Sequence, residues 1–512
     1  MKRRLLSCLP FLCASLLLAQ AGSSAPQDIP GPRHRLIILA DMGNEPDEEQ
    51  QMAHMLMCSN EFDVEGLIAV TGKYLRDKPR PDLFLKLIDG YEKVVDNLRL
   101  HAKHWPAPDY LRGITKAGQT GYGTAVIGEG KSSPGSELIV EAVTKSDPRP
   151  VWVVVNAGSN TLAQALLDYE ANHTPTEVEE FVAKLRVYEN GSQDNAGAWI
   201  CSRYPNIHWI RSNYQTYAYG GPGGRDGDTF TNLGPYYWRP YSNDANGQHE
   251  WLKEHVQTGH GALGELYPDR SFRADGKLSF MEGGGTIPWL GLMNKGLFDI
   301  NQPSWGGWSG RFSPKKVADF WSRHADIKPD EQKVAPFYTY REVSDTWTDP
   351  VNGGTLSNDY VPVWRWRKAT YTDFQCRMDW AVKPYAEANH HPVAAFNGDK
   401  SDTIVRLKAR PGQILTLDAS ATTDPDGDDI VYSWWVYKEA GTYPGDLHIQ
   451  RADQEKATVM IPTGAGSQQI HIILEIHDEN SIAPLYDYRR IVIDVTDAVM
   501  ELESTTPAAT HA

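Results

Sequence analysis

Residues 36–50 read Leu-Ile-Ile-Leu-Ala-Asp-Met-Gly-Asn-Glu-Pro-Asp-Glu-Glu-Gln, and this stretch decides the fold. The aliphatic run at 36–40 predicts a strand buried on both faces of a parallel sheet. Turn-forming residues follow at 43, 44 and 46, and apolar residues then recur at roughly helical spacing from Met52. The acidic residues of the stretch therefore lie in a strand-to-helix turn, which is where open α/β sheets bind their ligands.

This turn concentrates negative charge. Asp41, Glu45, Asp47 and Glu48 fall within residues 41–48, and carboxylates this close repel one another unless they share a cation or a proton. Oxygen ligands packed this densely suit a hard metal, so we expect a divalent cation here, with calcium favoured. Acidic residues also favour the positive end of a helix dipole. That alternative accounts for Asp47 and Glu48 but not for Asp41 at the strand end.

The turn resembles the amino-terminal Asp-x-Asp-Pro-Gly-x-Asp-Asp motif of the nucleoside hydrolase superfamily. It is more similar to the bacterial cellulose-binding, nucleoside hydrolase-like family, in which a hydrolase-like domain precedes a β-sandwich. The resemblance places Asp41, Asp47 and Glu48 on the first, penultimate and last acidic positions of the motif. It implies that Asp41 and Glu48 ligate the metal and that Asp47 is the general base or a sugar-hydroxyl acceptor. Gly43 replaces a metal-binding Asp, and Glu45 is the candidate to compensate for it.

Two polar residues complete the expected metal and substrate contacts near this turn. Asn160 follows the clearest predicted strand, 151–155, and the resemblance implies that its main-chain carbonyl ligates the metal. Capping of the following helix by Ser159 or Asn160 is the structural alternative. Asn44, within the acidic turn itself, is a candidate substrate contact.

Later segments supply further candidate substrate contacts. The resemblance matches Asn190 and Asp194 to residues that bind the sugar, whereas the alternative is a solvated turn in which Asp194 caps the next helix. Glu282 is the candidate for a late acidic residue that nucleoside hydrolases carry at a strand end. The closer family has an Asp where this chain has Gly284.

Two other segments have a functional and a structural interpretation. Trp305 and Trp308 present aromatic rings for a sugar, with Arg311 as a polar clamp, or they form a packed loop. Residues 424–429 read Asp-Pro-Asp-Gly-Asp-Asp, which is either a hairpin turn or a structural calcium loop.

Composition limits the class of partner. The formal net charge of −16 argues against nucleic acid or an anionic membrane as the main partner. The 16 Trp and 24 Tyr residues allow large cores and leave aromatic rings for carbohydrate. These features are compatible with the ligand that the resemblance implies, a carbohydrate that is either a glycan or a nucleoside.

The amino terminus predicts export. Three basic residues at 2–4 precede an apolar stretch from 5 to 18, and Ala-Gln-Ala at 19–21 has the pattern of a cleavage site. A signal peptide over 1–21 and a periplasmic or extracellular location follow. Later segments are too polar to predict a membrane span. Of the five cysteines, Cys58, Cys201 and Cys376 lie beyond the predicted signal peptide, and their wide spacing predicts neither a disulfide framework nor a zinc site.

The order of predicted elements divides the chain into domains. Strands and helices alternate in residues 33–318, which predicts a nucleoside hydrolase-like α/β domain with a mostly parallel sheet covered by helices on both faces. Residues 319–385 are a Trp-rich connecting region. Short alternating strands in 386–497 predict an immunoglobulin-like β-sandwich, and 498–512 form a disordered tail.

Two functions agree with these features. The first is a secreted glycoside or riboside hydrolase in which Asp47 activates water beside a metal. Its general acid is open, with His54 and His208 as the nearest candidates. The second is a polysaccharide-binding protein that uses a hydrolase scaffold without catalysis, which the glycines at 43 and 284 favour.

Overall fold

The computed structural model describes residues 25–28, 33–43, 45–213, 215–218, 249–269, 284–293, 296–319, 333–348 and 355–496. The predicted signal peptide, Asn44, Glu282 and the carboxyl-terminal tail lie outside these ranges. Across these described ranges, every helix is too short or too polar to cross a membrane.

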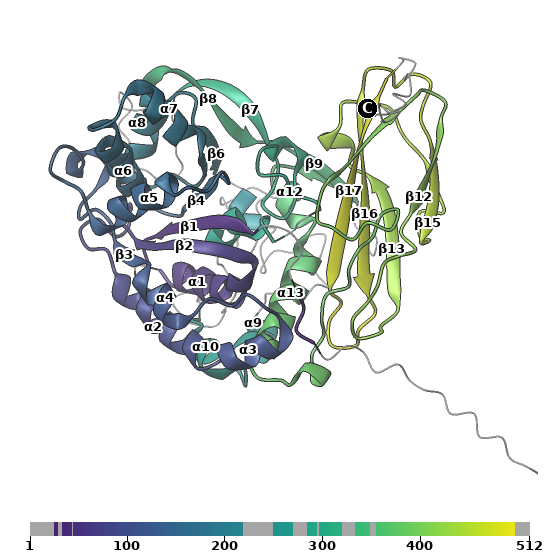
Figure 1. The fold of residues 1–512 in the computed structure, drawn as a ribbon, viewed down its shortest axis with the longest axis horizontal. Helices are drawn as coiled ribbons and strands as arrows, with labels where there is room; N and C mark the ends of the chain where they lie inside the picture. Colours follow the sequence, from purple (N-terminus) through teal and green to yellow (C-terminus); the bar gives the residue numbers. More distant parts are fainter. Residues whose placement is uncertain are drawn as a thin grey trace, which may run out of the picture.

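The first domain is built on an eight-stranded sheet with the order β3-β2-β1-β4-β5-β6-β8-β7 (Figure 1). Neighbouring strands are parallel except β7 and β8, which pair antiparallel at one edge. The strands are β1 (His34–Ala40), β2 (Phe62–Ala69), β3 (Thr115–Ala117), β4 (Val151–Val155), β5 (Leu185–Asn190), β6 (His208–Ser212), β7 (Phe312–Asp319) and β8 (Lys333–Glu342). The predicted mostly parallel sheet is confirmed.

Helices cover both faces of this sheet, as its uninterrupted apolar strands predicted. In β1, Leu36 and Ile38 face one core, whereas Ile37 and Leu39 face the other. The first core is covered by α1 (Asp47–Met57), α2 (Pro81–Glu92), α3 (Val95–His101), α4 (Pro108–Gly113) and α13 (Arg367–Trp380). The second is covered by α5 (Pro134–Thr144), α6 (Asn160–Glu170), α7 (Pro175–Ala183) and α8 (Ala196–Arg203). Short helices α9 (His249–Leu252), α10 (Gly261–Leu266), α11 (Ile287–Leu290) and α12 (Val361–Trp364) complete the domain.

The region predicted as a connection, 319–385, contributes to the first domain. It supplies β8 to the main sheet, and its helix α13 packs on α1 with Phe374 stacked on His54. A small hairpin of β9 (Asp345–Thr348) and β10 (Thr355–Asn358) lies between these elements. The helical pattern of α13 is hidden in the sequence because the helix is buried all round, so its hydrophobic residues form no stripe.

The second domain consists of two facing sheets (Figure 1). One has the order β11-β17-β16-β13 and the other β12-β15-β14, and their inner side chains form a separate core. The strands are β11 (Val405–Ala409), β12 (Ile414–Asp418), β13 (Ile430–Val436), β14 (Ile449–Gln450), β15 (Lys456–Met460), β16 (Gln469–Asp478) and β17 (Tyr486–Val495). The predicted immunoglobulin-like sandwich is confirmed.

Arg490 of β17 joins the two domains. Its fully buried guanidinium donates to the carbonyl oxygens of Leu297 at 2.7 Å, Trp305 at 2.9 Å and Gly306 at 3.0 Å. Burial lowers the pKa of Arg490 to about 10, so the side chain is charged at neutral pH. A charge inside a protein is tolerated only where hydrogen bonds replace its hydration. The sandwich is therefore held against the first domain by specific polar contacts.

We predict that Arg490→Ala lowers the free energy of unfolding by about 3 kcal/mol, because three buried carbonyl groups lose a charged donor. Urea unfolding followed by tryptophan fluorescence measures the change. Arg410→Ala removes an exposed arginine from the same domain and is the control. Equal stability of the two variants would contradict the anchoring role of Arg490.

Candidate functional site

The carboxyl ends of four adjacent strands form one polar edge. Asp41 follows β1, Gly72 follows β2, Asn156 follows β4 and Gln193 follows β5. Backbone hydrogen bonds continue beyond the strands and hold these turns together, including Asn156 N to Leu39 O at 2.9 Å. The strand order therefore brings together three of the polar segments that the sequence singled out.

Asp41 lies in a space that only glycine at position 72 leaves open. A Cβ atom on Gly72 would come within 2.7 Å of Asp41 Oδ2 and 2.4 Å of Gln193 Oε1. Gln193 is fixed in turn, because its side chain accepts from Lys73 N at 3.1 Å and donates to Asn156 O at 3.2 Å. Gln193 and Asn156 were not predicted as site residues, although both lie in segments after predicted strands that contain other candidate residues.

Glu48 is buried on the first turn of α1 and is in contact with Asn156. Asn156 Nδ2 donates to Glu48 Oε2 at 3.4 Å and to Gly285 O at 3.2 Å. Among the described residues, no donor reaches the buried Asn156 Oδ1. An acceptor oxygen beside a buried carboxylate is suited to a cation.

The electrostatics of the turn favour a bound cation. Burial, and then the nearby Asp47 carboxylate, raise the pKa of Asp41 and of Glu48 well above their usual range. Glu45 is exposed and contributes more weakly to the shift of Asp41. A divalent cation would relieve both the repulsion and the cost of burying these charges. The acidic residues present thus fit a metal by charge.

Asp194 ties two helices to this edge. Its carboxylate accepts from the backbone N–H groups of Ser159 at 3.1 Å, Asn160 at 3.3 Å and Ala196 at 2.9 Å. Burial raises its pKa to about 7, against the effect of these hydrogen bonds. The bond to Ala196, the first residue of α8, is the helix contact expected from the structural alternative, but Asp194 is buried and the turn is not solvated there. A direct role of Asp194 in sugar binding stays a prediction.

The two asparagines named from the sequence have identifiable partners. Asn160 is the first residue of α6, and its side-chain amide donates to Gly121 O at 2.9 Å and to Thr71 Oγ1 at 3.2 Å. Asn190 Oδ1 accepts from Thr216 Oγ1 at 2.8 Å. Their roles in ligating the metal and binding the sugar stay predictions.

Comparison with known proteins gives the family. The model described as "Cellulose-binding Sde182, nucleoside hydrolase-like domain" matches residues 35–312, which is more than half of the chain. The chain belongs to this family. A second model, "Cellulose-binding protein Sde0182, C-terminal domain", matches residues 414–495. Both domains of the Sde182-type architecture are therefore present.

A solved structure supports the assignment over nearly the whole chain. A nucleoside hydrolase-related hypothetical protein from Saccharophagus degradans, described as associated with carbohydrate metabolism, is 36% identical. The match covers 91% of this chain and 100% of that one, with a TM-score of 0.76. Two more distant matches are the effector protein XOO4466, which is 13% identical with a TM-score of 0.32, and the titin M3 domain, which is 8% identical with a TM-score of 0.14. They cover 69% and 20% of this chain, and 95% and 97% of their own. No curated protein sequence matches this chain.

The Sde182-like domain packs the two candidate sugar-binding tryptophans against the sandwich. Trp305 and Trp308 are 6% and 4% exposed. The Arg406 guanidinium lies 4.8 Å from the Trp305 ring centroid, and Trp308 meets Tyr488 edge to face. Arg311 is bound to Asp345 at 2.6 Å. The packed-loop alternative describes this segment, because neither indole presents a face to a sugar.

Of the two candidate general acids, His54 is buried in the core and His208 is half-buried. His54 stacks on Phe374 with ring centroids 3.8 Å apart, and burial lowers its pKa to about 3. Burial lowers the pKa of His208 to about 3 as well. Because both rings are neutral at physiological pH, neither is suited to donate a proton to a leaving group.

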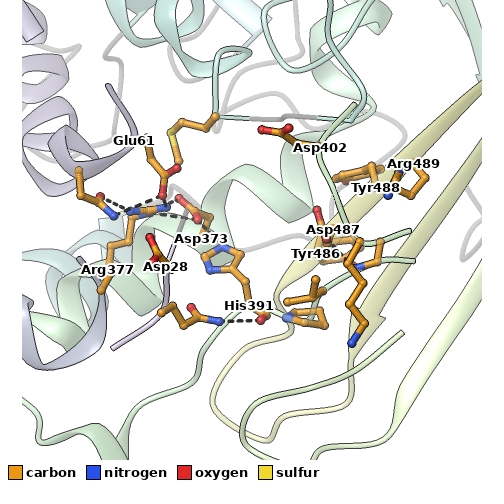
Figure 2. A pocket seen from close by; sticks show the side chains of 18 of the residues that line it. Asp28, Glu61, Asp373, Arg377, His391, Asp402, Tyr486, Asp487, Tyr488 and Arg489 are labelled. Carbon is orange, nitrogen blue, oxygen red and sulfur yellow. Dashed lines mark hydrogen bonds and ion pairs between the residues drawn. The ribbon is translucent and has the colours of Figure 1, made fainter. Parts of the chain in front are cut away.

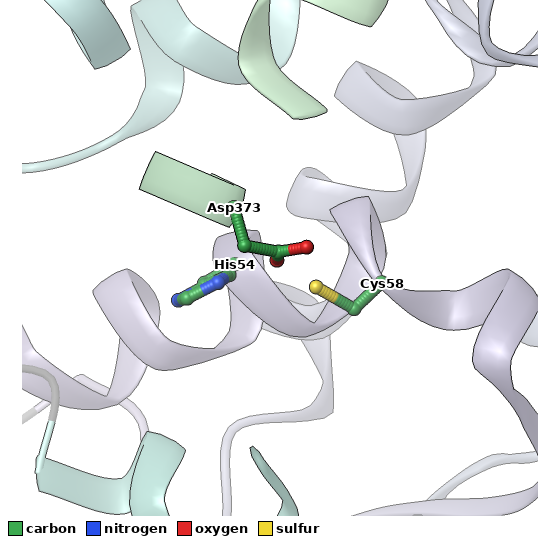
Figure 3. Close-up of side chains that lie close together, drawn as sticks. All are labelled: His54, Cys58 and Asp373. Carbon is green, nitrogen blue, oxygen red and sulfur yellow. The ribbon is translucent and has the colours of Figure 1, made fainter. Parts of the chain in front are cut away.

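Two groups of described residues bring three metal-ligating atoms within 4.8 Å of one another, and the strand-end carboxylates are not one of them. The first group is His54, Cys58 and Asp373, between α1 and α13 (Figure 3). Although burial alone would raise it, the charge of Arg377 and a hydrogen bond to His391 lower the pKa of Asp373 to about 2. These cationic partners already balance the carboxylate, so we interpret this group as part of the core.

The second group is Asp424, Asp426 and Asp428 in the sandwich. Asp424 Oδ1 accepts from the backbone N–H groups of residues 426, 427 and 428 at 2.8, 2.8 and 3.0 Å. The segment folds back on itself, but the predicted hairpin turn is wrong, because it joins β12 of one sheet to β13 of the other. A structural calcium ion at the turn stays a prediction.

A separate cavity of about 150 Å³ lies between the domains (Figure 2). Asp373 and Arg377 of α13 line one side, and Tyr486 and Asp487 of β17 line the other. Glu61, which also lines it, directly precedes β2, whereas Gly72 follows that strand. The cavity is therefore at the opposite end of β2 from the acidic turn.

We predict that Gly72→Ala destabilises the fold by about 1–3 kcal/mol, because the added methyl group displaces the Asp41 carboxylate or the Gln193 amide. Chemical denaturation measures the loss. Gly113→Ala, where a Cβ atom meets nothing within 4 Å, is the control and should be neutral or stabilising. Equal effects of the two substitutions would show that position 72 tolerates a side chain.

A second prediction concerns pH. The Glu342 carboxylate accepts from Ser212 Oγ, Asn213 N and Gln215 N at 2.6–2.8 Å, and burial raises its pKa from 4.5 to about 7. A folded-state pKa above the unfolded value means that the folded protein binds the proton more tightly, so this group's contribution to stability falls as pH rises from about 4.5 to 7.

Glu342→Gln removes the titration and should flatten the fall in stability. At 1.36 kcal/mol per pKa unit, the difference between wild type and variant should change by about 3 kcal/mol between pH 4.5 and 7.5. Urea unfolding at both pH values measures it, with exposed Glu387→Gln as the control. Parallel pH profiles for wild type and Glu342→Gln would refute the assignment.

Proposed function

We propose that this protein hydrolyses a glycosidic bond of a carbohydrate, with calcium bound at the acidic turn after β1. The observation that carries the proposal is the pair of buried carboxylates, Asp41 and Glu48, at the carboxyl end of a parallel sheet, where burial and the nearby Asp47 carboxylate raise the pKa of both. Buried carboxylates with strongly raised pKa values cluster at functional sites, where they serve a ligand or a reaction. The printed association of the S. degradans relative with carbohydrate metabolism supports the class of substrate.

Each residue of the turn has a role in this proposal. When bound, calcium would supply positive charge that attracts sugar hydroxyl groups and acidifies water. Asp41, Glu48 and the main-chain carbonyl of Asn160 would hold it, with Glu45 at the exposed side. Asp47 is half-buried on the first turn of α1 and would take the proton from the attacking water.

The neighbouring groups position rather than react. Asn156 orients Glu48 through its side-chain amide, and Gln193 holds the backbone of Asn156 beside Asp41. Asn190 would donate to a sugar hydroxyl from the same edge. We further propose export of the protein, because the segment at 1–21 has the charged, apolar and small-residue regions of a signal peptide.

A non-catalytic carbohydrate-binding function is the second candidate. Gly43, which stands where the superfamily motif has a ligating Asp, has φ +99°, and a Cβ atom there would lie 2.8 Å from Leu83 Cδ1. The turn is thus built for glycine and excludes that ligand. The "cellulose-binding" description of the family favours the same alternative.

Release of reducing sugar and nucleobase from polysaccharides, oligosaccharides and nucleosides, assayed with calcium, separates the two functions. We expect Asp47→Asn to lower the rate about 10²–10⁴-fold, as for the loss of a general base. Asp109→Asn changes an exposed acid in the first turn of α4 and should leave the rate unchanged.

The remaining outcomes discriminate between the proposals. Release that survives Asp47→Asn would support hydrolysis but contradict the role of Asp47 as the general base. The absence of release from every substrate, together with retention on cellulose, would establish the binding function instead.

A further inference from the structure

A basic loop adjoins the acidic turn. Residues 73–80, here called the basic loop, read Lys-Tyr-Leu-Arg-Asp-Lys-Pro-Arg and contain four basic residues and one acid in a chain with a net charge of −16. The loop begins directly after Gly72, which lies against Asp41. At its other end, the Arg80 guanidinium lies 3.4 Å from where a Cβ atom of Gly43 would be. Both ends of the loop therefore flank the acidic turn.

Local contacts hold the basic loop in shape. Gly72 N donates to Leu75 O at 2.8 Å, and Lys73 N donates to Gln193 Oε1 at 3.1 Å. Arg76 Nε donates to Lys73 O at 2.9 Å, while its guanidinium stacks 4.4 Å from the ring centroid of Tyr122. These contacts thus hold the loop in place beside the acidic turn.

The outer surface of the loop combines charge with an aromatic ring. Arg76 and Lys78 are exposed, and Tyr74 is 46% exposed with Lys73 Nζ 5.5 Å from its ring centroid. The planar guanidinium group carries several N–H donors, whose geometry matches a carboxylate or sulfate group. Tyrosine rings next to such donors provide an apolar surface for a sugar ring.

We propose that the basic loop binds an oxyanion on the saccharide, a carboxylate or a sulfate ester, and that the substrate of this site is an acidic glycan rather than neutral cellulose. The inference rests on the proposed carbohydrate function and specifies its substrate class. Lys73 and Arg76 are the main contacts with the oxyanion. The acids after β1 face the hydroxyl groups of the same saccharide.

A structural explanation makes a different prediction. If the basic residues only offset the negative charge of the turn, their removal should weaken binding of neutral and acidic saccharides alike. If they contact an oxyanion, their removal should weaken only the acidic ligands. The two explanations are therefore separable by measuring binding without any catalytic step.

Isothermal titration calorimetry with three trisaccharides tests the proposal: one of uronic acid, one sulfated and one of cellulose type. We expect at least one acidic trisaccharide to bind at least about tenfold more tightly than the neutral one at 50 mM salt, with a smaller preference at 300 mM because salt screens exposed charges. The acidic ligand that shows the preference identifies the oxyanion. Titrations with and without calcium separate direct binding from chelation of calcium by the ligand.

Variants identify the residues responsible. The double variant Lys73→Gln/Arg76→Gln should lose the roughly tenfold preference and bind the neutral trisaccharide within about twofold of wild type. The double variant Arg99→Gln/Arg112→Gln removes the same charge from α3 and α4 and should keep the preference.

Two results would overturn the inference. Equal affinity of wild type for neutral and acidic trisaccharides would contradict the proposal that the substrate is acidic. Equal weakening of both by the basic-loop variant would show that the basic residues only offset the charge of the turn. Failure of all three trisaccharides to bind would instead refute the proposed carbohydrate function, and this inference with it.

Discussion

The arrangement of the site depends on burying negative charge where four parallel strands end. Asp41 and Glu48 lose most of their hydration at this edge, and burial together with repulsion from the nearby Asp47 carboxylate raises their pKa values. The surrounding structure is organised to tolerate this cost. Gly72 leaves room for the Asp41 carboxylate, Asn156 donates to Glu48, and the backbone around Asp194 supplies three donors to a further carboxylate. A stable site of this kind requires either protons or a cation, which links its occupancy to pH.

The sequence predicted the fold well wherever structure follows local periodicity. The strands at 36–40 and 151–155 and the helix that follows the second strand are all present, because the periodicity of each segment matches the surface that it buries. It did not predict that β8 and α13 belong to the first domain. The helix α13 carries buried Arg377, Asp373 and Asp379, whose polarity concealed a core position that neutralising partners make possible.

For the site, prediction was limited by partners that are distant in sequence. The acidic turn was evident because its residues are adjacent in the chain, but Gln193 and Asn156 acquire their importance only when β5 and β4 lie beside β1. Trp305 and Trp308 show the converse. Their spacing resembled a sugar platform, yet the surface that buries them comes from residues 406 and 488 in the other domain. Local sequence reveals site residues that are adjacent in a single turn. It does not reveal contacts between residues that come together only in the folded chain.

The anchoring of β17 by Arg490 also has a consequence for the proposed binding of a glycan. Modules on flexible tethers raise the local concentration of a ligand by an amount that depends on linker length. Here the Arg490 guanidinium binds three carbonyl groups of the first domain, so the surfaces of the two domains are held at one separation. A glycan that contacted both domains would have to match that one separation, whereas a flexible tether would let the domains adjust to the spacing of the ligand.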